Sequence, residues 1–364
     1  MDGIYFYGML AVVWVITVGI SALVPYLSRR PVSFGVALPP ERYGDEEVRR
    51  QRLRYMGQSV LAGILLGIGA GILSAWVDRD GAALWHAALL LVYSAVTLLL
   101  FLQARSRLKR LKEERDWTVP TARYVAVDTA FHRQRSTPGW GWYVLPLLIL
   151  AASAGTAAWY YPTLPDVLNV HYNGAGEVDR TAPKSIGLIF TPSLISLLVT
   201  GLLAVAGGAV TRSKQELNPS DPEGSRERSL AYRRAGSLFL LMLAVPVNLL
   251  FGLIQLGLAG LLGVRVVEAG AIGLTLLILA VSILYAVRMS KLNLREPGFL
   301  LKDDDSHWKG GLFYYNPDDA AILVEKRVGL GWTLNYAHTI SWLLTLAPFL
   351  LTAIIVATAV FAGG

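Results

Sequence analysis

The chain has 364 residues, 54% of them hydrophobic and 16% charged, with 33 Lys and Arg against 26 Asp and Glu for a net charge of +7. Apolar segments of about 20 residues are what a bilayer core requires, so this composition predicts a polytopic membrane protein. The absence of cysteine excludes disulfides, thiolate catalysis and cysteine-based zinc sites.

Eight apolar segments are long enough to cross a bilayer, and we expect each to form a transmembrane helix. They cover residues 4–27, 60–77, 82–103, 140–161, 186–211, 237–263, 269–287 and 341–362. The first segment begins almost at Met1, with Asp2 and no basic residue before it, so we expect a retained helix rather than a signal peptide.

The basic residues predict how the chain is oriented. Alternate connections, at 29–56, 104–139, 212–235 and 288–340, carry 7, 9, 6 and 7 Lys and Arg, which is 29 of the 33. By the positive-inside rule these connections are cytoplasmic, so both termini and the loop at 164–185 lie outside. The excess charge then favours inner-leaflet lipid as a partner rather than nucleic acid.

All 26 acidic residues also fall in connections, so no Asp, Glu, Lys or Arg is expected inside a span. Ionisable groups within the membrane mark proton relays, ion-coupled transport and intramembrane proteolysis. Their absence argues against these three functions. Proline residues at Pro146, Pro192, Pro246 and Pro348 fall within spans and predict helix kinks.

The cytoplasmic connections differ in character. The first is turn-rich and then helical, with Asp45 as the predicted N-cap of a basic helix that continues into the second span. The third span should likewise continue as a basic helix through residues 106–117, followed by a short strand around Tyr124. The polar segment 216–229 contains two prolines, and we expect it to be mobile.

The segment 290–340 is rich in aromatic and β-branched residues. Runs at 311–315, 321–326 and 331–336 are separated by turn-forming residues, Asn316 to Asp319 and Gly329 to Gly331. This pattern predicts a small three-stranded meander on the cytoplasmic side. Three strands are near the minimum for independent stability, so the meander should pack on the inner loops or the membrane surface.

The most informative stretch is LPDVLNVHYNGAGEVDRTAPKS, residues 164–185. Alternation in VLNVHY predicts a strand with Asn169, His171 and Asn173 on one face. The Asn173-Gly174-Ala175-Gly176 segment supplies turn residues, and the chain should return antiparallel through Asp179. The sequence therefore predicts a polar hairpin outside the membrane.

Three interpretations of this hairpin compete. His171 and Asp179 hold a rigid lid through mutual hydrogen bonding; the polar face recognises an extracellular ligand; or the pair forms part of a metal or acid–base site. A catalytic metal normally takes about three protein ligands. The loop offers a single His, and His86, near the outer end of the third span, is the candidate second one.

The loop resembles the conserved module of the SdpI-type membrane proteins, bacterial multi-span proteins that include the immunity and signal-sensing partner of a secreted toxin peptide. The resemblance covers the fourth span and the loop. It is carried by Leu164, Pro165, Asp166, His171, Asn173, Gly176, Asp179 and Lys184. It implies ligand recognition by Asp166, His171, Asn173, Gly176, Asp179 and Lys184.

Residues 304–337 resemble a second module, without an established activity, that is common in Gram-positive membrane proteins. The positions that carry this resemblance are Trp308, Gly311, Tyr315, Asn316, Pro317, Asp319, Lys326, Arg327, Gly329, Gly331, Trp332 and Asn335. This chain has additional N-terminal spans and this added module compared with the immunity protein, so immunity is one of several possible roles.

Together these observations predict an all-α polytopic membrane protein with an outer hairpin and a small cytoplasmic β module. The expected parts are residues 1–139, 140–211, 212–289, 290–340 and 341–364. We expect a non-enzymatic protein of the bacterial cytoplasmic membrane, without a cofactor, that senses or confers immunity to an extracellular ligand such as a secreted antimicrobial peptide. Its partners are the bilayer, a peptide outside and a protein inside. The alternative is an enzyme or transporter with a metal-assisted site at His171 and Asp179.

Overall fold

The computed structural model describes residues 3–28, 31–119, 138–172, 177–211, 213, 221–294 and 304–362. This part contains eight α-helices. They are α1 (Gly3–Leu23), α2 (Glu46–Ser74), α3 (Arg79–Glu114), α4 (Val144–Tyr160), α5 (Ile186–Thr211), α6 (Pro222–Leu258), α7 (Val264–Leu294) and α8 (Thr339–Ala362). By length and composition, α1 to α7 are each suited to cross a membrane. The chain is therefore a multi-pass α-helical membrane protein.

Several helices extend well beyond the apolar spans. Helix α2 begins at Glu46 because Asp45 caps it, with the Asp45 carboxylate accepting from the Glu47 N–H at 3.0 Å. Helix α3 continues to Glu114 as predicted. Helix α6 begins at Pro222 behind the N-cap Asp221, so residues 222–229 of the segment predicted to be mobile form the first turns of a helix. The strand expected around Tyr124 lies outside the described residues.

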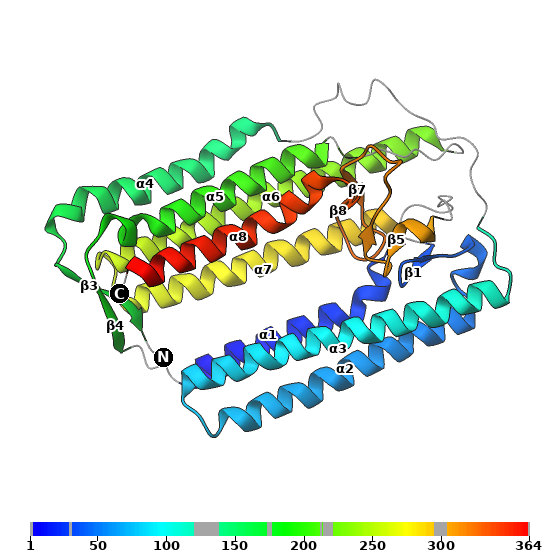
Figure 1. The fold of residues 1–364 in the computed structure, drawn as a ribbon, viewed down its shortest axis with the longest axis horizontal. Coiled ribbons are helices and arrows are strands. Elements are labelled where there is room, and N and C mark those ends of the chain that lie inside the picture. Colours follow the sequence, from blue (N-terminus) through cyan, green and yellow to red (C-terminus); the bar gives the residue numbers. More distant parts are fainter. Residues whose placement is uncertain are drawn as a thin grey trace.

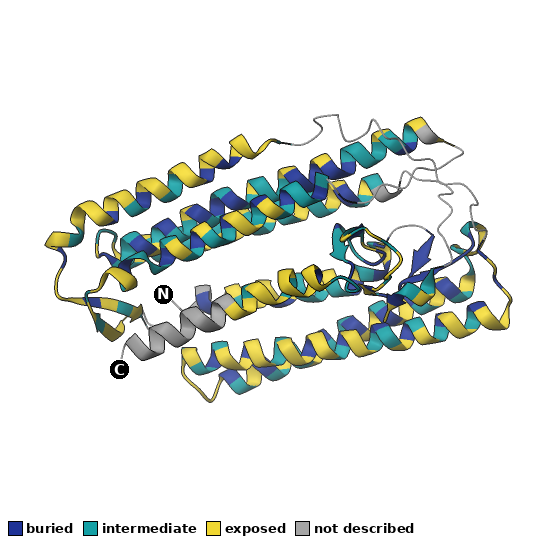
Figure 2. Ribbon diagram, turned by 45° about the horizontal axis from the view of Figure 1, so that its top comes forward, coloured by how far each residue is buried: buried dark blue, intermediate teal, exposed yellow. Residues whose placement is uncertain are grey.

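The helices pack in two groups. Helices α1, α2 and α3 contact one another, and in the second group α6 contacts α4, α5 and α7 (Figure 1). Figure 2 shows exposed residues running along the outward faces of both groups, as expected where helices meet lipid. Pro192 lies inside α5 and Pro246 inside α6, as predicted.

The β structure divides between the two ends of the helices. The hairpin of β3 (Val167–Tyr172) and β4 (Val178–Pro183) lies at the same end as the start of α1 and the end of α8 (Figure 1). We call this the hairpin end. The opposite end, here the module end, holds β1 (Val32–Ser33), β2 (Val36–Ala37) and the strands of residues 304–338, the C-terminal module.

The C-terminal module is not a three-stranded meander, and that prediction is wrong. Its strands are β5 (Trp308–Lys309), β6 (Phe313–Tyr314), β7 (Leu323–Glu325) and β8 (Trp332–Leu334). They form two hairpins, β5–β6 and β7–β8, joined by one parallel bridge between Tyr314 and Asn335. The turn after β6 directs the chain away from that strand, because Asn316 accepts from the Asp318 N–H and closes an Asx turn.

Candidate functional site

The β3–β4 hairpin stands on the ends of three helices. Leu164 and Leu168 are buried at its base against Ala157 of α4, Ile189 of α5 and Ala259, the residue that follows α6. The Lys184 N–H donates to the Asp166 carbonyl at 2.7 Å and closes the hairpin at the same point. An isolated two-stranded hairpin is only marginally stable in water, so this apolar base holds the strands in position.

The hairpin exposes its polar face as the alternation predicts. Asn169 and His171 are exposed, whereas Leu168 is buried and Val170 is half-buried. The His171 Nδ1 lies 2.6 Å from a carboxylate oxygen of Asp179 across the strands, and both side chains are open to solvent. The strand register shifts on both sides of His171, so a β-bulge sets the direction of the His171 side chain.

The remaining residues of the predicted recognition set divide by position. Asp166 is fully exposed, whereas Lys184 is largely buried and donates from Nζ to the Leu164 carbonyl at 2.8 Å. The Lys184 ammonium also lies 5.6 Å from the centre of the Tyr161 ring. Lys184 therefore holds the base of the hairpin. The turn residues Asn173 and Gly176 lie outside the described residues.

His86 does not join His171. It is buried in α3, where its Nδ1 accepts a hydrogen bond from the Trp14 indole of α1 at 2.9 Å, and the Trp14 ring also packs against Tyr93. Within the described residues no group of three or more His, Asp or Glu is arranged to hold a metal ion. Among the described residues, His171 and Asp179 thus form a pair without a third metal ligand.

At the module end, the resemblance residues of the C-terminal module mostly maintain its own structure. Asn335 is fully buried; its side-chain amide donates to the Asn316 and Asp319 carbonyls and its Oδ1 accepts from the Asn316 N–H. The Asp319 carboxylate accepts from the Tyr314 hydroxyl at 2.9 Å. Tyr315 and Lys326 remain exposed. The module is thus ordered by a connected polar network.

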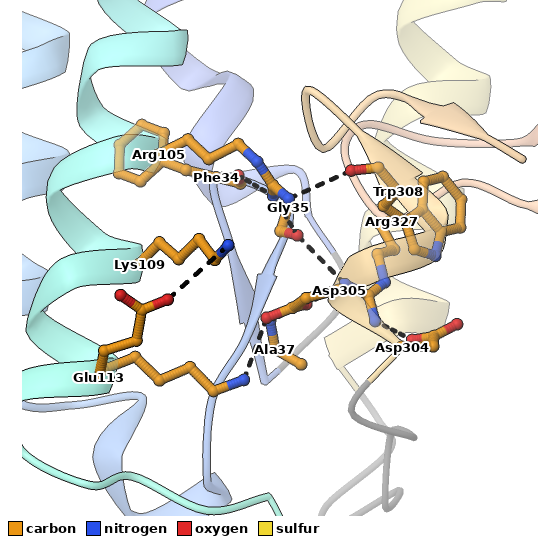
Figure 3. Close-up of polar contacts among 11 residues, drawn as sticks. Phe34, Gly35, Ala37, Arg105, Lys109, Glu113, Asp304, Asp305, Trp308 and Arg327 are labelled. Carbon is orange, nitrogen blue, oxygen red and sulfur yellow. Dashed lines mark hydrogen bonds and ion pairs between the residues drawn. The ribbon is translucent and has the colours of Figure 1, made fainter.

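Arg327 and Asp305 join the module to the first helix group (Figure 3). Arg327 is 4% exposed and pairs with Asp304 and Asp305, while it also donates to the Gly35 carbonyl. Asp305 additionally accepts from Lys112 of α3 at 3.0 Å and from the Ala37 N–H at 3.1 Å. Burial opposes ionisation of Asp305, but Arg327 and these donors outweigh it, so the pKa of Asp305 lies below its usual value.

The turn between β1 and β2 fits tightly into this cluster. Phe34 and Gly35 both have positive φ, 50° and 70°, as a two-residue type I′ hairpin turn requires. Arg105 of α3 donates to both carbonyls and to that of Trp308 (Figure 3). A Cβ on Gly35 would lie 2.6 Å from the Gly311 carbonyl oxygen. The turn is therefore in close backbone contact with the module, and the Arg105 side chain of α3 binds the backbone of both.

The module also contacts the second helix group, through Trp332. Its ring packs on Tyr232 of α6 with centroids 5.0 Å apart and lies over Gly236, where a Cβ would be 2.4 Å from the ring. The Gly331 N–H donates to the Tyr232 hydroxyl at 2.8 Å. The module thereby bridges both groups of helices at this end.

Helices α5 and α6 carry a polar contact that the sequence reasoning missed. Ser196 donates to the Asn248 side-chain oxygen at 2.9 Å, and the Asn248 amide donates to Thr200 at 2.7 Å. Nearer the hairpin, Ser193 donates to Gln255 at 2.7 Å. Asn248 and Gln255 are fully buried. The available signal was a pair of amide side chains within an otherwise apolar span, a composition typical of helix–helix hydrogen bonding.

Two family models match the chain. One, a domain of unknown function (DUF1648), matches residues 148–195, which include most of α4, the hairpin and the start of α5. The other, a family of unknown function (DUF5808), matches residues 317–342, which include β7, β8 and the start of α8. No curated protein and no solved structure matches the chain.

The fold and these matches define a multi-pass membrane protein that combines two domains of unknown function. Neither family description names an SdpI-type protein, so that resemblance enters only as a proposal. The first matched segment contains the hairpin, and the second contains the β7–β8 half of the C-terminal module, so the matches fall at opposite ends of the bundle.

Proposed function

We propose that this protein senses, or confers immunity to, an extracellular peptide that it recognises at the β3–β4 hairpin. The observation that carries the proposal is an exposed His171–Asp179 pair on a hairpin whose base is buried among three helix ends. A rigid support with an exposed polar face suits recognition, because little ordering is needed when a partner binds. The SdpI-type resemblance of the same residues supports this choice.

We assign the hairpin end to the outside of the cell. The support is the distribution of basic residues, since the four connections expected at the module end hold 29 of the 33 Lys and Arg. The start of α1 and the end of α8 then lie outside as well.

The peptide binds as an added strand along β4. Five of the six residues of β4 are exposed. Strand β3 pairs with β4 and also contacts α6. Among the described residues, the edge of β4 that faces away from β3 is therefore the one open to an added strand. Pro183 has no N–H and ends the pairing edge at the base. An extended peptide therefore pairs with residues 178–182, and its side chains meet His171 and Asp179.

Helix α6 couples the hairpin to the C-terminal module. It runs unbroken from Tyr232, which contacts Gly331, to Gln255, which bonds with Ser193 of α5 near the hairpin. Pro246 lies between these two residues of α6, and Pro192 directly precedes Ser193 in α5; each interrupts the hydrogen-bond ladder of its helix. A shift of the hairpin then changes the packing of α5 on α6 and the position of Trp332. The surface of the module that faces the cytoplasm changes as a result.

The test is a challenge of a sensitive bacterial host with purified secreted antimicrobial peptides. Cells expressing the wild type should survive, and His171→Ala or Asp179→Ala should remove most of the protection. Asp80→Ala is the matched control, because Asp80 is an exposed carboxylate in the first turn of α3, at the same end of the bundle. Equal survival of all strains, the empty-vector strain included, would defeat the recognition proposal.

The coupling is tested separately. The chain has no cysteine, so a single cysteine at the exposed Tyr315 can be labelled directly. A peptide that passes the survival test should change the labelling rate at this position in inside-out vesicles. An unchanged rate, with protection intact, would remove the coupling step and leave recognition standing.

A further inference from the structure

Helix α7 carries an uncovered apolar stripe. The stripe recurs at the three- and four-residue spacing of one helix face, and all its members are exposed. It consists of Gly273, Leu276, Leu277, Ala280, Leu284 and Val287. Residues roughly opposite the stripe pack on α6: Val267 meets Gly257, and the Tyr285 ring stacks on Phe239 with centroids 4.0 Å apart. Met289, on the same side as Tyr285, is fully buried. The stripe thus lies on the side of α7 turned away from this contact.

The same face ends in two cations. Arg288 and Lys291 follow Leu284 and Val287 at helical spacing, and both are exposed. No hydrogen bond or ion pair holds either side chain within the part of the chain that the structure describes. At the other end of α7, Arg265 has the carboxylate of Glu268 three residues away, so the charges there offset one another. The excess positive charge of this helix lies at the module end alone.

The spacing matches one leaflet of a bilayer. Leu277 and Val287 are ten residues apart, which is about 15 Å along an α-helix. Half of a hydrocarbon core is also about 15 Å thick. An acyl chain lying along this part of the stripe therefore brings a phosphate to the level of Arg288 and Lys291.

We propose that α7 binds one anionic phospholipid of the leaflet at the module end, with its acyl chains on the Leu277–Val287 stripe and its phosphate between Arg288 and Lys291. Charge complementarity selects this occupant. A zwitterionic lipid fits the stripe equally well but brings no net negative charge to the two cations. This site is separate from the hairpin and does not depend on the proposed recognition function.

The test uses the full-length protein in nanodiscs that contain phosphatidylglycerol and phosphatidylcholine with identical acyl chains. Lipids retained by the protein are counted by native mass spectrometry. The wild type should retain phosphatidylglycerol in preference to phosphatidylcholine. Arg288→Gln/Lys291→Gln should reduce that preference about 25-fold, since each cation near the membrane surface contributes roughly five-fold to anionic lipid binding.

The matched control is Lys109→Gln/Arg115→Gln. It removes the same charge from the module end, but from side chains that already face carboxylates, Glu113 at 3.7 Å and Asp45 at 3.9 Å. This variant should keep the wild-type preference. All substituted side chains are exposed, and equal melting temperatures in phosphatidylcholine check that the fold is unchanged.

Four results would overturn the proposal. The first is equal retention of both lipids by the wild type, and the second is an equal loss of preference in the two variants. The third is a dimer with no retained lipid, which would assign the stripe to a second copy of the chain. Complete displacement of the lipid by soluble glycerol phosphate would refute the acyl-chain contact.

Discussion

The two ends of the bundle use charged residues in opposite ways. At the hairpin end, His171 of β3 and Asp179 of β4 pair in contact with solvent, and Asn169, Arg180 and Thr181 on these strands are also exposed. At the module end, Arg327 and Asp305 pair with side chains only 4% and 12% exposed, among further donors from α3 and β2. An exposed pair contributes little to stability, whereas a buried pair is costly to break.

This difference separates recognition from structure. The hairpin leaves its polar groups accessible to a partner and depends on an apolar base for stability. The module uses its polar groups to connect β1–β2, α3 and its own strands. Four substitutions test whether the comparison holds, and the largest effect is expected at the module end.

Asp305→Asn should destabilise the protein by about 3–5 kcal/mol, because it leaves the buried Arg327 and Lys112 with less than full charge compensation. The measurement is thermal unfolding of the purified protein in detergent. Asp318→Asn is the control, since Asp318 is exposed in the same module. Similar stabilities of the two variants would mean that the buried ion pair of Asp305 contributes no more to stability than an exposed carboxylate.

Gly236→Ala should cost about 1–3 kcal/mol, because the new Cβ would lie 2.4 Å from the Trp332 ring and the ring must move. Gly57→Ala provides the comparison: nothing lies within 4 Å of its Cβ position in α2. That control should be neutral or slightly stabilising. Limited proteolysis of the module would detect the loosened contact; wild-type resistance in Gly236→Ala would argue against docking through Trp332.

Asn248→Leu should destabilise the α5–α6 pair by about 1 kcal/mol, the usual size of a hydrogen bond between membrane helices. Thr156→Val removes an exposed hydroxyl that bonds only within α4, to the Ala152 carbonyl, and should have a smaller effect. Thermal unfolding of both variants gives the difference. A stabilised Asn248→Leu variant would show that the amide is kept for a reason other than packing.

The smallest effect is expected for His171→Ala, less than about 1 kcal/mol, because the pair with Asp179 is exposed. A double-mutant cycle with Asp179→Ala measures the coupling directly. A coupling energy above about 2 kcal/mol would place the hairpin pair in the same class as the buried pair at the module end. The comparison on which the proposed function rests would then fail.

Local signals in the sequence were sufficient for much of the fold. Asp45 before a charged helix predicted an N-cap, and the alternation in residues 167–172 predicted a strand with His171 on its polar face. These features depend on neighbours within a few residues. The pairing of His171 with Asp179 followed from the hairpin geometry alone.

Contacts between distant residues gave no comparable signal. Asp305 lies 268 residues from Ala37 and 193 from Lys112, and nothing near Asp305 in the chain distinguishes it from Asp304 or from Asp318. The meander prediction failed for the same reason. Strand propensity located the strands of the module, but the choice of partners depended on Asn335, which bonds with the turn at Asn316 and Asp319.

The β1–β2 turn has a consequence for biogenesis. Its Ala37 N–H finds the Asp305 carboxylate only after the ribosome has added another 268 residues, and Arg327 reaches the Gly35 carbonyl 292 residues after Gly35 itself was made. Helices α1 to α7 are synthesised before that point. The nascent protein therefore carries an unfinished module end while α1 to α7 are made, and the completion of that end is a late step in folding.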